Sequence, residues 1–202
     1  MKAVIFGATG GTGRELVKLC LEKRFEVTAF VRDPTKITDE KVKSVKGDAR
    51  NPAEVEEAVK GNEVVFSCIG VKPGQKPINS ISTANIISAM HKEKIKRIIV
   101  ESAYGVGKTR KKGIYAKLLW TVINPLIKDK EEMEKMIESS GLEWTIIQPP
   151  ILTNDPLTGK YQFGENTPVN GFAKISRADV AHLMLKVAEE GTTIKQNVII
   201  TK

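Results

Sequence analysis

The sequence has few of the residues that metal sites and disulfide-stabilised folds require. Among 202 residues there are two cysteines and two histidines, which are Cys20, Cys68, His91 and His182. The four are widely separated along the chain, which argues against a disulfide framework and leaves no candidate cluster of metal ligands. We therefore expect both cysteines to be buried thiols and the chemistry of the protein to use no metal.

Long hydrophobic runs are absent as well. The apolar stretch after Met1 and Lys2 covers only residues 3–6, which is too short for the core of a secretory signal, and no run approaches the length of a membrane span. These absences predict a cytoplasmic protein with no membrane partner. Hydrophobic residues make up 41% and charged residues 28% of the chain, as in soluble globular proteins, and no shift in composition divides it. Residues 1–202 are therefore expected to form one domain.

Acidic residues are outnumbered by basic ones, which gives a formal net charge of +8. A nucleic-acid-binding protein would gather this charge on one face, among aromatic side chains. Aromatic residues are only 5% of this chain, and the lysines are spread along most of it. The densest basic run, residues 108–113, is better explained as a solvated loop. We expect no nucleic-acid partner, and a basic surface that attracts anionic small molecules.

Apolar runs of strand length alternate with amphipathic stretches of helix length across nearly the whole chain. The predicted strands cover residues 2–6, 26–31, 42–46, 63–69, 97–101, 144–148 and 197–201. The predicted helices cover residues 11–23, 52–60, 81–93, 130–139 and 177–189. Right-handed crossovers between such units place helices on both faces of the sheet. The sequence therefore predicts an α/β fold with a doubly wound, mostly parallel sheet.

Residues 149–171 interrupt this alternation. They contain four prolines and three glycines and show little periodicity. We expect a long ordered loop there, near the carboxyl ends of the strands, and loops of this length often carry function. A plain connection between two elements is the alternative.

A glycine-rich turn follows the first predicted strand. Gly7, Gly10 and Gly13 form the spacing GxxGxxG at the opening of a predicted helix. The first glycine suits the tight turn, the second lets a pyrophosphate approach backbone N–H groups, and the third lets helix and strand pack closely. The helix start adds a partial positive charge and free donors, so the pattern predicts a dinucleotide site. The residues assigned to its phosphates are Gly7, Thr9, Gly10, Gly11, Thr12 and Gly13, with the two threonine hydroxyls as donors.

The end of the second predicted strand discriminates between NADP and NAD. NAD-binding chains place an acidic residue there for the ribose hydroxyls, whereas this chain has Arg32, nineteen residues after Gly13. The planar guanidinium suits a 2′-phosphate and the face of the adenine, with Arg14 and Lys36 as further basic groups. NADP is therefore the expected coenzyme. Asp33 leaves NAD as the alternative, because a shift of one residue in the strand end would exchange the two roles.

Two further strand ends contribute candidate coenzyme contacts. Asp48 lies just past the third predicted strand, where its carboxylate would accept a hydrogen bond from the adenine amino group, and Ala49 follows it. Ile69 and Gly70 end the fourth predicted strand, where bare backbone would leave room for a ribose or the nicotinamide. Both places lie at the carboxyl edge of the sheet, where open α/β sheets bind ligands.

Taken in order, these motifs resemble those of the atypical short-chain dehydrogenase/reductase superfamily. The nearest resemblance is to its small NAD(P)H-binding proteins, which include the biliverdin-IXβ reductases, also called flavin reductases, and the NmrA-like proteins. It covers essentially the whole chain, through the segments IFGATGGTG, VRDPTK, KGDARN, GLEWTIIQPPILTNDPLTGKY and KISRADVAHLML. The glycine turn is widely shared, whereas the last two segments are more particular. The resemblance implies a Rossmann fold with a substrate pocket above the nicotinamide.

The resemblance also implies which residues surround that pocket. A serine after the fifth strand faces the nicotinamide in the flavin reductases, and Ser102 is the matching residue. Pro149 and Pro150 match a Pro-Pro pair that those proteins follow with a histidine, and here Ile151 stands in place of the histidine. All four residues are assigned to the coenzyme and substrate site. The replacement implies a more apolar pocket and disfavours biliverdin as the substrate.

The Ser-Tyr-Lys set of the wider superfamily is incomplete. In that set, tyrosine is the general acid and a lysine four residues later lowers its pKa. Tyr115 lies thirteen residues after Ser102, but Leu119 occupies the lysine position. Tyr104 and Lys108 have the YxxxK spacing, yet they follow Ser102 on a glycine-containing loop, where the match is best explained as coincidence.

These residues predict an NADPH-dependent reductase of flavins, quinones or similar planar acceptors. Direct hydride transfer to such a ring gives a delocalised anion that water protonates, so positioning and exclusion of solvent provide most of the acceleration. The predicted catalytic residues are Ser102, which bonds the carboxamide or the acceptor, and Tyr104, which shapes the site. Residues 149–151 form its wall. The alternative is an NmrA-like protein that binds NADP(H) as a redox sensor without turnover, which the missing acid residues suit equally well.

Overall fold

The computed structural model describes residues 1–71, 74–109, 114–170 and 172–202, and of residues 114–124 it describes the backbone alone. The strands in these ranges are β1 (Lys2–Phe6), β2 (Glu26–Val31), β3 (Val42–Lys46), β4 (Val64–Ser67), β5 (Arg97–Glu101), β6 (Glu143–Gln148), β7 (Ile151–Thr153), β8 (Gln162–Gly164), β9 (Lys174–Ser176) and β10 (Gln196–Thr201). The α-helices are α1 (Gly11–Glu22), α2 (Pro52–Val59), α3 (Asn79–Lys92), α4 (Ile114–Ser139) and α5 (Arg177–Glu189). Two 3-10 helices, η1 (Pro34–Lys36) and η2 (Gly107–Thr109), lie in the loops.

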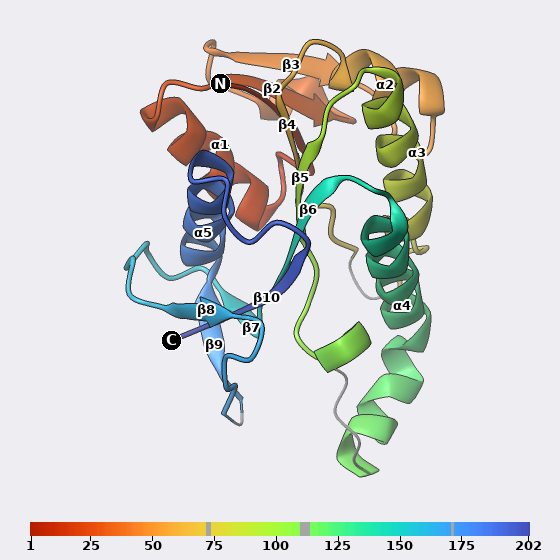
Figure 1. Ribbon diagram of the computed structural model, residues 1–202, viewed down its shortest axis with the longest axis vertical. Helices are drawn as coiled ribbons and strands as arrows, with labels where there is room; N and C mark the ends of the chain where they lie inside the picture. Colours follow the sequence, from red (N-terminus) through yellow and green to blue (C-terminus); the bar gives the residue numbers. More distant parts are fainter. Residues whose placement is uncertain (72–73, 110–113, 171) are drawn as a thin grey trace.

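Eight of the strands form one sheet in the order β3-β2-β1-β4-β5-β6-β10-β8. Every pairing in it is parallel except that of β8, which runs antiparallel to β10. Helices α1 and α5 cover one face, and α2, α3 and α4 cover the other (Figure 1). The chain therefore has the predicted doubly wound Rossmann architecture.

The core lies on both faces of the sheet, and strand β1 shows why. Ala3 and Ile5 pack in the cluster beneath α1 and α5, while Val4 and Phe6 pack in the cluster on the opposite face. Successive side chains of a strand point to opposite faces, so a strand covered by helices on both sides is apolar throughout. All four side chains are completely buried. The cysteines Cys20 and Cys68 are buried free thiols in the first cluster, as predicted.

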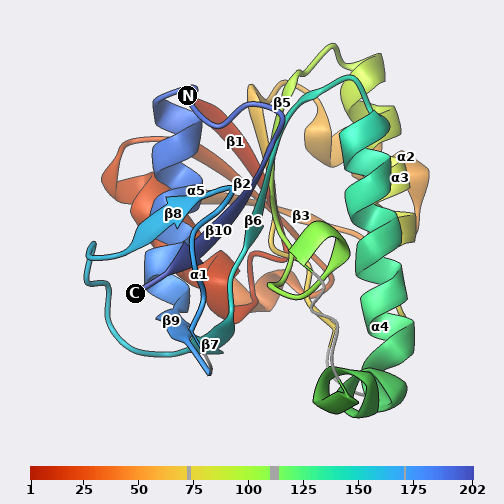
Figure 2. The ribbon, with the colours of Figure 1, turned by 60° about the horizontal axis from the view of Figure 1, so that its bottom comes forward.

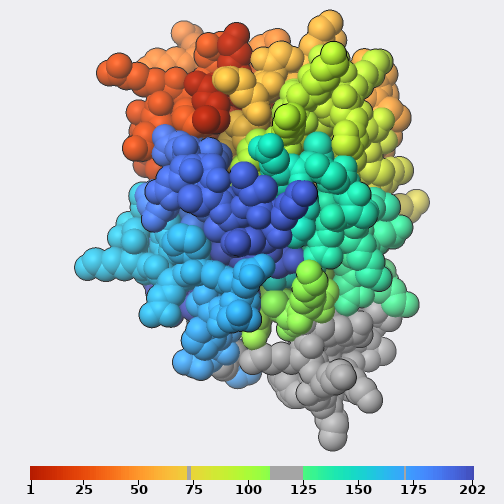
Figure 3. Space-filling view, viewed as in Figure 1, coloured from red at the N-terminus to blue at the C-terminus, as the bar shows by residue number. Residues whose placement is uncertain are grey.

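The loops that follow β5 and β6 lie in the lower half of Figure 1. There the loop after β5 carries η2, and the chain after β6 continues into β7, which pairs with β9 in a separate two-stranded sheet. Figure 2 brings this end forward and shows η2 between the sheet and α4. In Figure 3 the C-terminal segments, in dark blue, fill the middle of the face between α4 and residues of the β7–β9 region. The loops that surround this end therefore follow two neighbouring strands of the sheet, β5 and β6.

Helix α4 is much longer than the sequence predicts. The prediction begins at residue 130, whereas the helix begins at Ile114 and continues through Pro125 to Ser139. Proline lacks the N–H of one intrahelical hydrogen bond and usually ends a helix, which hides the first half of α4 from a pattern search. Although α4 has 26 residues, neither it nor any other helix in the described part of the chain is apolar enough over sufficient length to cross a membrane.

The segment 149–171 is less irregular than predicted. It contains β7 and β8, and β9 follows shortly after it. Each of these strands has three residues, too few for the alternation by which longer strands are recognised. A carboxylate holds the rest of the segment in place: Asp179 accepts hydrogen bonds from the backbone N–H groups of Thr158 and Gly159 and from the hydroxyl of Ser176. Thr158 and Gly159 are thereby tied to the first turn of α5.

Candidate functional site

The glycine turn after β1 is close-packed against backbone. The N–H of Gly10 donates to the carbonyl of Gly7 at 2.9 Å, and Gly7 has a φ of +79°, which favours glycine. A Cβ on Gly7 would lie 2.5 Å from the carbonyl oxygen of Cys68, and a Cβ on Gly13 would lie 2.2 Å from that of Gly7. Both positions therefore require glycine. Helix α1 begins with Gly10 as its N-cap and has no side-chain capping bond, which leaves its first N–H groups available to an anion.

The two threonines of the turn differ in their surroundings. Thr9 is half-buried, whereas Thr12 is 4% exposed and its hydroxyl donates to Oε1 of Glu101 at 3.0 Å. A hydroxyl has one proton to donate, and that of Thr12 is directed at Glu101 rather than toward a phosphate. The contribution of Thr12 to a phosphate site therefore rests on its backbone N–H.

The end of β2 separates the roles of Arg32 and Asp33. The Asp33 carboxylate accepts hydrogen bonds from the N–H and hydroxyl of Thr35 at 3.2 and 2.7 Å, and it lies 3.7 Å from the ammonium of Lys36. The hydrogen bond from the Thr35 hydroxyl lowers the pKa of Asp33. Asp33 thus caps η1, while Arg32 is exposed at the edge of the sheet.

The end of β3 brings an acid close to Arg32. Arg50 donates to both carboxylate oxygens of Asp48. These bonds lower the pKa of Asp48 to about 2, and the charge of Arg32 contributes to the same shift. Next to it, Ala49 is buried and its carbonyl accepts a hydrogen bond from Asn85 at 2.9 Å.

The end of β4 is open. Ile69 is half-buried, and Gly70 is exposed. No described atom lies within 4 Å of the position that a Cβ on Gly70 would take. The backbone at this point is therefore accessible, and its contact with a ribose or the nicotinamide stays a prediction.

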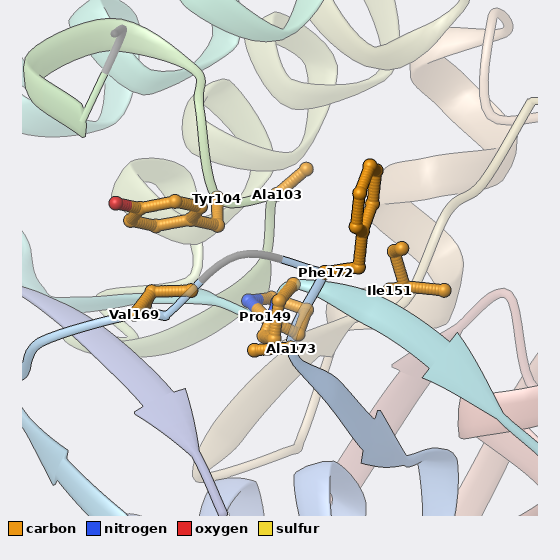
Figure 4. Close-up of a pocket in the computed structure, with 8 residues that line it drawn as sticks. Ala103, Tyr104, Pro149, Ile151, Val169, Phe172 and Ala173 are labelled. Atoms are coloured by element: carbon orange, nitrogen blue, oxygen red, sulfur yellow. The ribbon is translucent and has the colours of Figure 1, made fainter.

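A pocket of about 260 Å³ lies where the chain leaves β5 and β6. Eight residues line it: Ala103, Tyr104, Pro149, Pro150, Ile151, Val169, Phe172 and Ala173. Figure 4 shows Tyr104 and Val169 on one side of it, and Ile151 and Phe172 on the other. None of the eight side chains is charged, and the Phe172 side chain is 77% exposed at the edge. The pocket can hold a flat apolar group between hydrophobic walls.

Ser102 immediately precedes Ala103 and Tyr104 in the chain but is not itself among the residues that line the pocket. It is 4% exposed, and its hydroxyl donates to Oε1 of Glu134 at 2.5 Å. Gln148 donates to the same oxygen at 2.9 Å. The hydroxyl proton of Ser102 is therefore held by Glu134, and the serine oxygen keeps its lone pairs for a donor such as an amide.

The buried charges of α4 that support Ser102 were not predicted from the sequence. Burial raises the pKa of Glu134 and of Glu101, and burial lowers the pKa of Lys130, whose ammonium lies 3.4 Å from the carbonyl oxygen of Glu101. Lys130 and Glu134 are four residues apart and stand beside the buried Met133 and Ile137. That spacing places them on one helix face. A charged pair on the same face as apolar residues is the sequence pattern that could have indicated them. They link Ser102 to Thr12 through Glu101.

The tyrosine–lysine pairs considered from the sequence are not assembled in the described residues. Lys108 lies 3.1 Å from Glu138 of α4, so its charge is directed at that helix. The side chains of Tyr115 and Leu119 lie outside the described residues, as do residues 110–113 of the basic run. In the described part of the chain, no three His, Cys, Asp or Glu side chains are placed to hold a metal ion.

A family model described as NAD(P)H-binding matches residues 7–191, from the glycine turn to the residues after α5. The chain belongs to this NAD(P)H-binding family. Its fold agrees with that of solved structures. The anaerobillin reductase ChuY from Escherichia coli O157:H7 has a TM-score of 0.85 and 24% identity, covering 99% of this chain and 96% of that one. A Veillonella parvula short-chain dehydrogenase/reductase in complex with NADP has a TM-score of 0.82 and 22% identity, covering 100% and 94%.

Of three relatives found by sequence, two are much longer than this chain. The chloroplastic Arabidopsis thaliana protein At2g34460 is 28% identical over 78% of this chain, which spans 61% of that protein. The Bacillus subtilis protein YwnB is 28% identical over 94% of this chain and 92% of its own length. The NAD(P)H azoreductase of Xenophilus azovorans is 26% identical over 72% of this chain, which spans 46% of that enzyme.

The residues present fit the dinucleotide that the NAD(P)H-binding family takes. The turn from Gly7 to Gly13 offers uncapped N–H groups to a pyrophosphate, Arg32 is exposed at the end of β2, and Gly70 leaves open backbone. The apolar pocket lies at the same carboxyl edge of the sheet. These features are those that a dinucleotide-binding site requires.

Proposed function

We propose that the protein is an NADPH-dependent reductase of flat, electron-poor acceptors such as flavins and quinones. The observation that carries the proposal is the pocket beside the strand ends, which is lined by eight uncharged residues. A planar ring fits between such walls, whereas a substrate that needs a charged partner does not. A sequence relative, the NAD(P)H azoreductase of Xenophilus azovorans, is a reductase that uses a nicotinamide coenzyme, which favours the same class.

Each part of the chain has a task in this proposal. The glycine turn and the start of α1 bind the diphosphate, and Arg32 binds the 2′-phosphate. Bound NADPH supplies the hydride. Tyr104, Pro149 and Ile151 orient the acceptor and exclude water, and Ser102, held by Glu134, orients the carboxamide of the nicotinamide or the acceptor itself.

A redox sensor that binds NADP(H) without turnover is the second candidate. It is favoured by the same absence of charged side chains among the eight lining residues, since none of them is a strong acid or base. Purified protein mixed with NADPH and excess flavin mononucleotide or a quinone separates the two functions. The reductase oxidises NADPH at a rate that depends on the acceptor, whereas a sensor leaves the NADPH absorbance unchanged with every acceptor.

The coenzyme preference is tested by Arg32→Ala. Asp33 is engaged in capping η1, so Arg32 is the side chain at this strand end left to meet the 2′-position. We expect the variant to lose about 1.5 to 3 kcal/mol of NADPH affinity, the range for a hydrogen bond to a charged group, and to bind NADH as before. Titration of both coenzymes measures this, with the exposed Lys43→Ala as the control for loss of one charge. Equal losses for the two coenzymes would place the 2′-phosphate elsewhere.

Ser102→Ala tests the role of the buried serine. We expect turnover to fall about tenfold, because one orienting hydrogen bond of about 1.4 kcal/mol is removed, while the dissociation constant for NADPH stays within about twofold. Steady-state kinetics and coenzyme titration measure the two effects. Ser88→Ala, at an exposed position of α3, is the control. An unchanged rate would remove Ser102 from the mechanism.

A further inference from the structure

The side chain of Arg177 lies directly over the glycine turn. A Cβ on Gly11 would lie 2.3 Å from Cδ and 2.6 Å from Nε of Arg177. Gly11 stands outside the GxxGxxG spacing, and the nearest atoms to its missing Cβ all belong to this one arginine. Gly11, the glycine of the turn that lies outside this spacing, therefore makes room for the side chain of Arg177.

Two neighbours fix the position of Arg177. It is the first residue of α5, and the preceding Ser176 caps that helix by accepting a hydrogen bond from the N–H of Asp179 at 3.0 Å. Its Nη1 donates to Oδ1 of Asn154, just after β7, at 2.7 Å. Helices α1 and α5 lie side by side in Figures 1 and 2, so the start of α5 is next to the start of α1. The arginine is thus held over the turn from a distant part of the chain.

The charges around Arg177 favour an additional anion. The start of a helix carries a partial positive charge, and a cation placed there is repelled. No acidic residue lies in the first turn of α1. The charge of Arg177 interacts with the carboxyl group of Glu101. That carboxyl group also interacts with the charge of Lys130 and accepts a hydrogen bond from the Thr12 hydroxyl. Asn154 takes one of the five N–H donors of the guanidinium, and no other described residue forms a hydrogen bond or ion pair with it.

We propose that Arg177 binds the pyrophosphate of the coenzyme, together with the backbone N–H groups of the turn. The inference rests on the coenzyme-binding part of the proposed function and is independent of the acceptor. Arg177 differs from Arg32 in that its partner is common to NADPH and NADH. The sequence places it in ISRADV, where its neighbour Ser176 gives a helix-cap signal and nothing indicates a phosphate contact.

The test measures the dissociation constants of NADPH and NADH for Arg177→Ala, with 2′-AMP as a competitor that lacks the pyrophosphate. We expect both coenzymes to bind about tenfold to a hundredfold more weakly, as after loss of a hydrogen bond to a charged group, and 2′-AMP to bind as before. Lys18→Ala, at an exposed position of α1 with the same change in charge, should leave all three constants within about twofold. Arg32→Ala should show the complementary pattern and weaken NADPH and 2′-AMP.

Three results would overturn the assignment: unchanged constants for both coenzymes, a loss confined to NADPH, or an equal loss for 2′-AMP. Arg177→Lys, which keeps the charge but loses the planar fork, replaces the alanine variant if that variant does not fold, and a smaller parallel loss is then expected. Failure of the proposed reductase is distinguishable. In that case the wild-type protein binds NADPH but does not oxidise it, whichever acceptor is added. The dissociation constants of the coenzymes for Arg177→Ala still decide the role of the arginine.

Discussion

Gly7→Ala is expected to weaken NADPH binding by at least about a hundredfold and to destabilise the protein by about 2–4 kcal/mol. The new Cβ would lie 2.5 Å from the carbonyl oxygen of Cys68, on backbone that cannot rotate away, and Gly7 also has a φ of +79°. Strain of about 1 kcal/mol and overpacking of 1–3 kcal/mol add together. A displaced turn loses at least two charge-assisted hydrogen bonds to phosphate, about 3 kcal/mol in all. Denaturant unfolding and coenzyme titration measure the two effects.

Gly61→Ala is the matched control for backbone strain. Gly61 has a φ of +74°, almost the same as Gly7, but no described atom lies within 4 Å of the position of its Cβ. It should cost about 1 kcal/mol and leave coenzyme binding unchanged. If the two variants lost equal stability, or if Gly7→Ala bound NADPH within about tenfold of the wild type, close packing against β4 would not be what the turn requires.

Lys130→Met is expected to cost about 3–5 kcal/mol of stability at about pH 8, and clearly less at about pH 5. The substitution removes the buried ammonium that faces Glu101 and Glu134, and an uncompensated buried charge is strongly destabilising. Burial raises the pKa of both acids above the ordinary value of 4.5. In the folded state they therefore hold their protons to higher pH than in the unfolded chain, and the stability they contribute falls as the pH rises through the raised pKa.

Without Lys130, the pKa values of both acids should rise further, so the pH dependence should steepen. Lys128→Met removes an exposed charge from the same helix and should change stability by less than about 0.5 kcal/mol at either pH. Denaturant unfolding at the two pH values gives the comparison. A loss that is the same at both values would show that packing of the lysine stem, and not the buried acids, sets the cost.

Much of the fold follows from local patterns. The bounds of β1, β2, β3 and β5 agree with those predicted, because each is an apolar or alternating run between polar segments. Helix α5 also has its predicted bounds, since Ser176 caps it. The three-residue strands β7, β8 and β9 depend on pairing with distant partners, and no local pattern indicates them.

The site divides in the same way. The close-packed glycine turn could be predicted because all of its residues adjoin in the sequence, whereas the role of Arg32 stays a prediction. The contacts of Arg177, Lys130 and Glu134 could not be predicted, because these residues meet Gly11, Glu101 and Ser102, respectively, only after the sheet has formed. The sequence shows that such residues are charged, but their partners come from other elements. The Thr12 hydroxyl illustrates the point, since its buried partner Glu101 lies at the end of β5.

Calorimetric titration of the wild-type protein with NADPH and with NADH tests the central claim most directly. A coenzyme held by the glycine turn and by Arg32 should bind with one molecule per chain, and NADPH should bind at least about tenfold more tightly than NADH, as one hydrogen bond to a charged group provides. The account would be contradicted if neither coenzyme produced heat of binding at saturating concentration and neither competed with 2′-AMP.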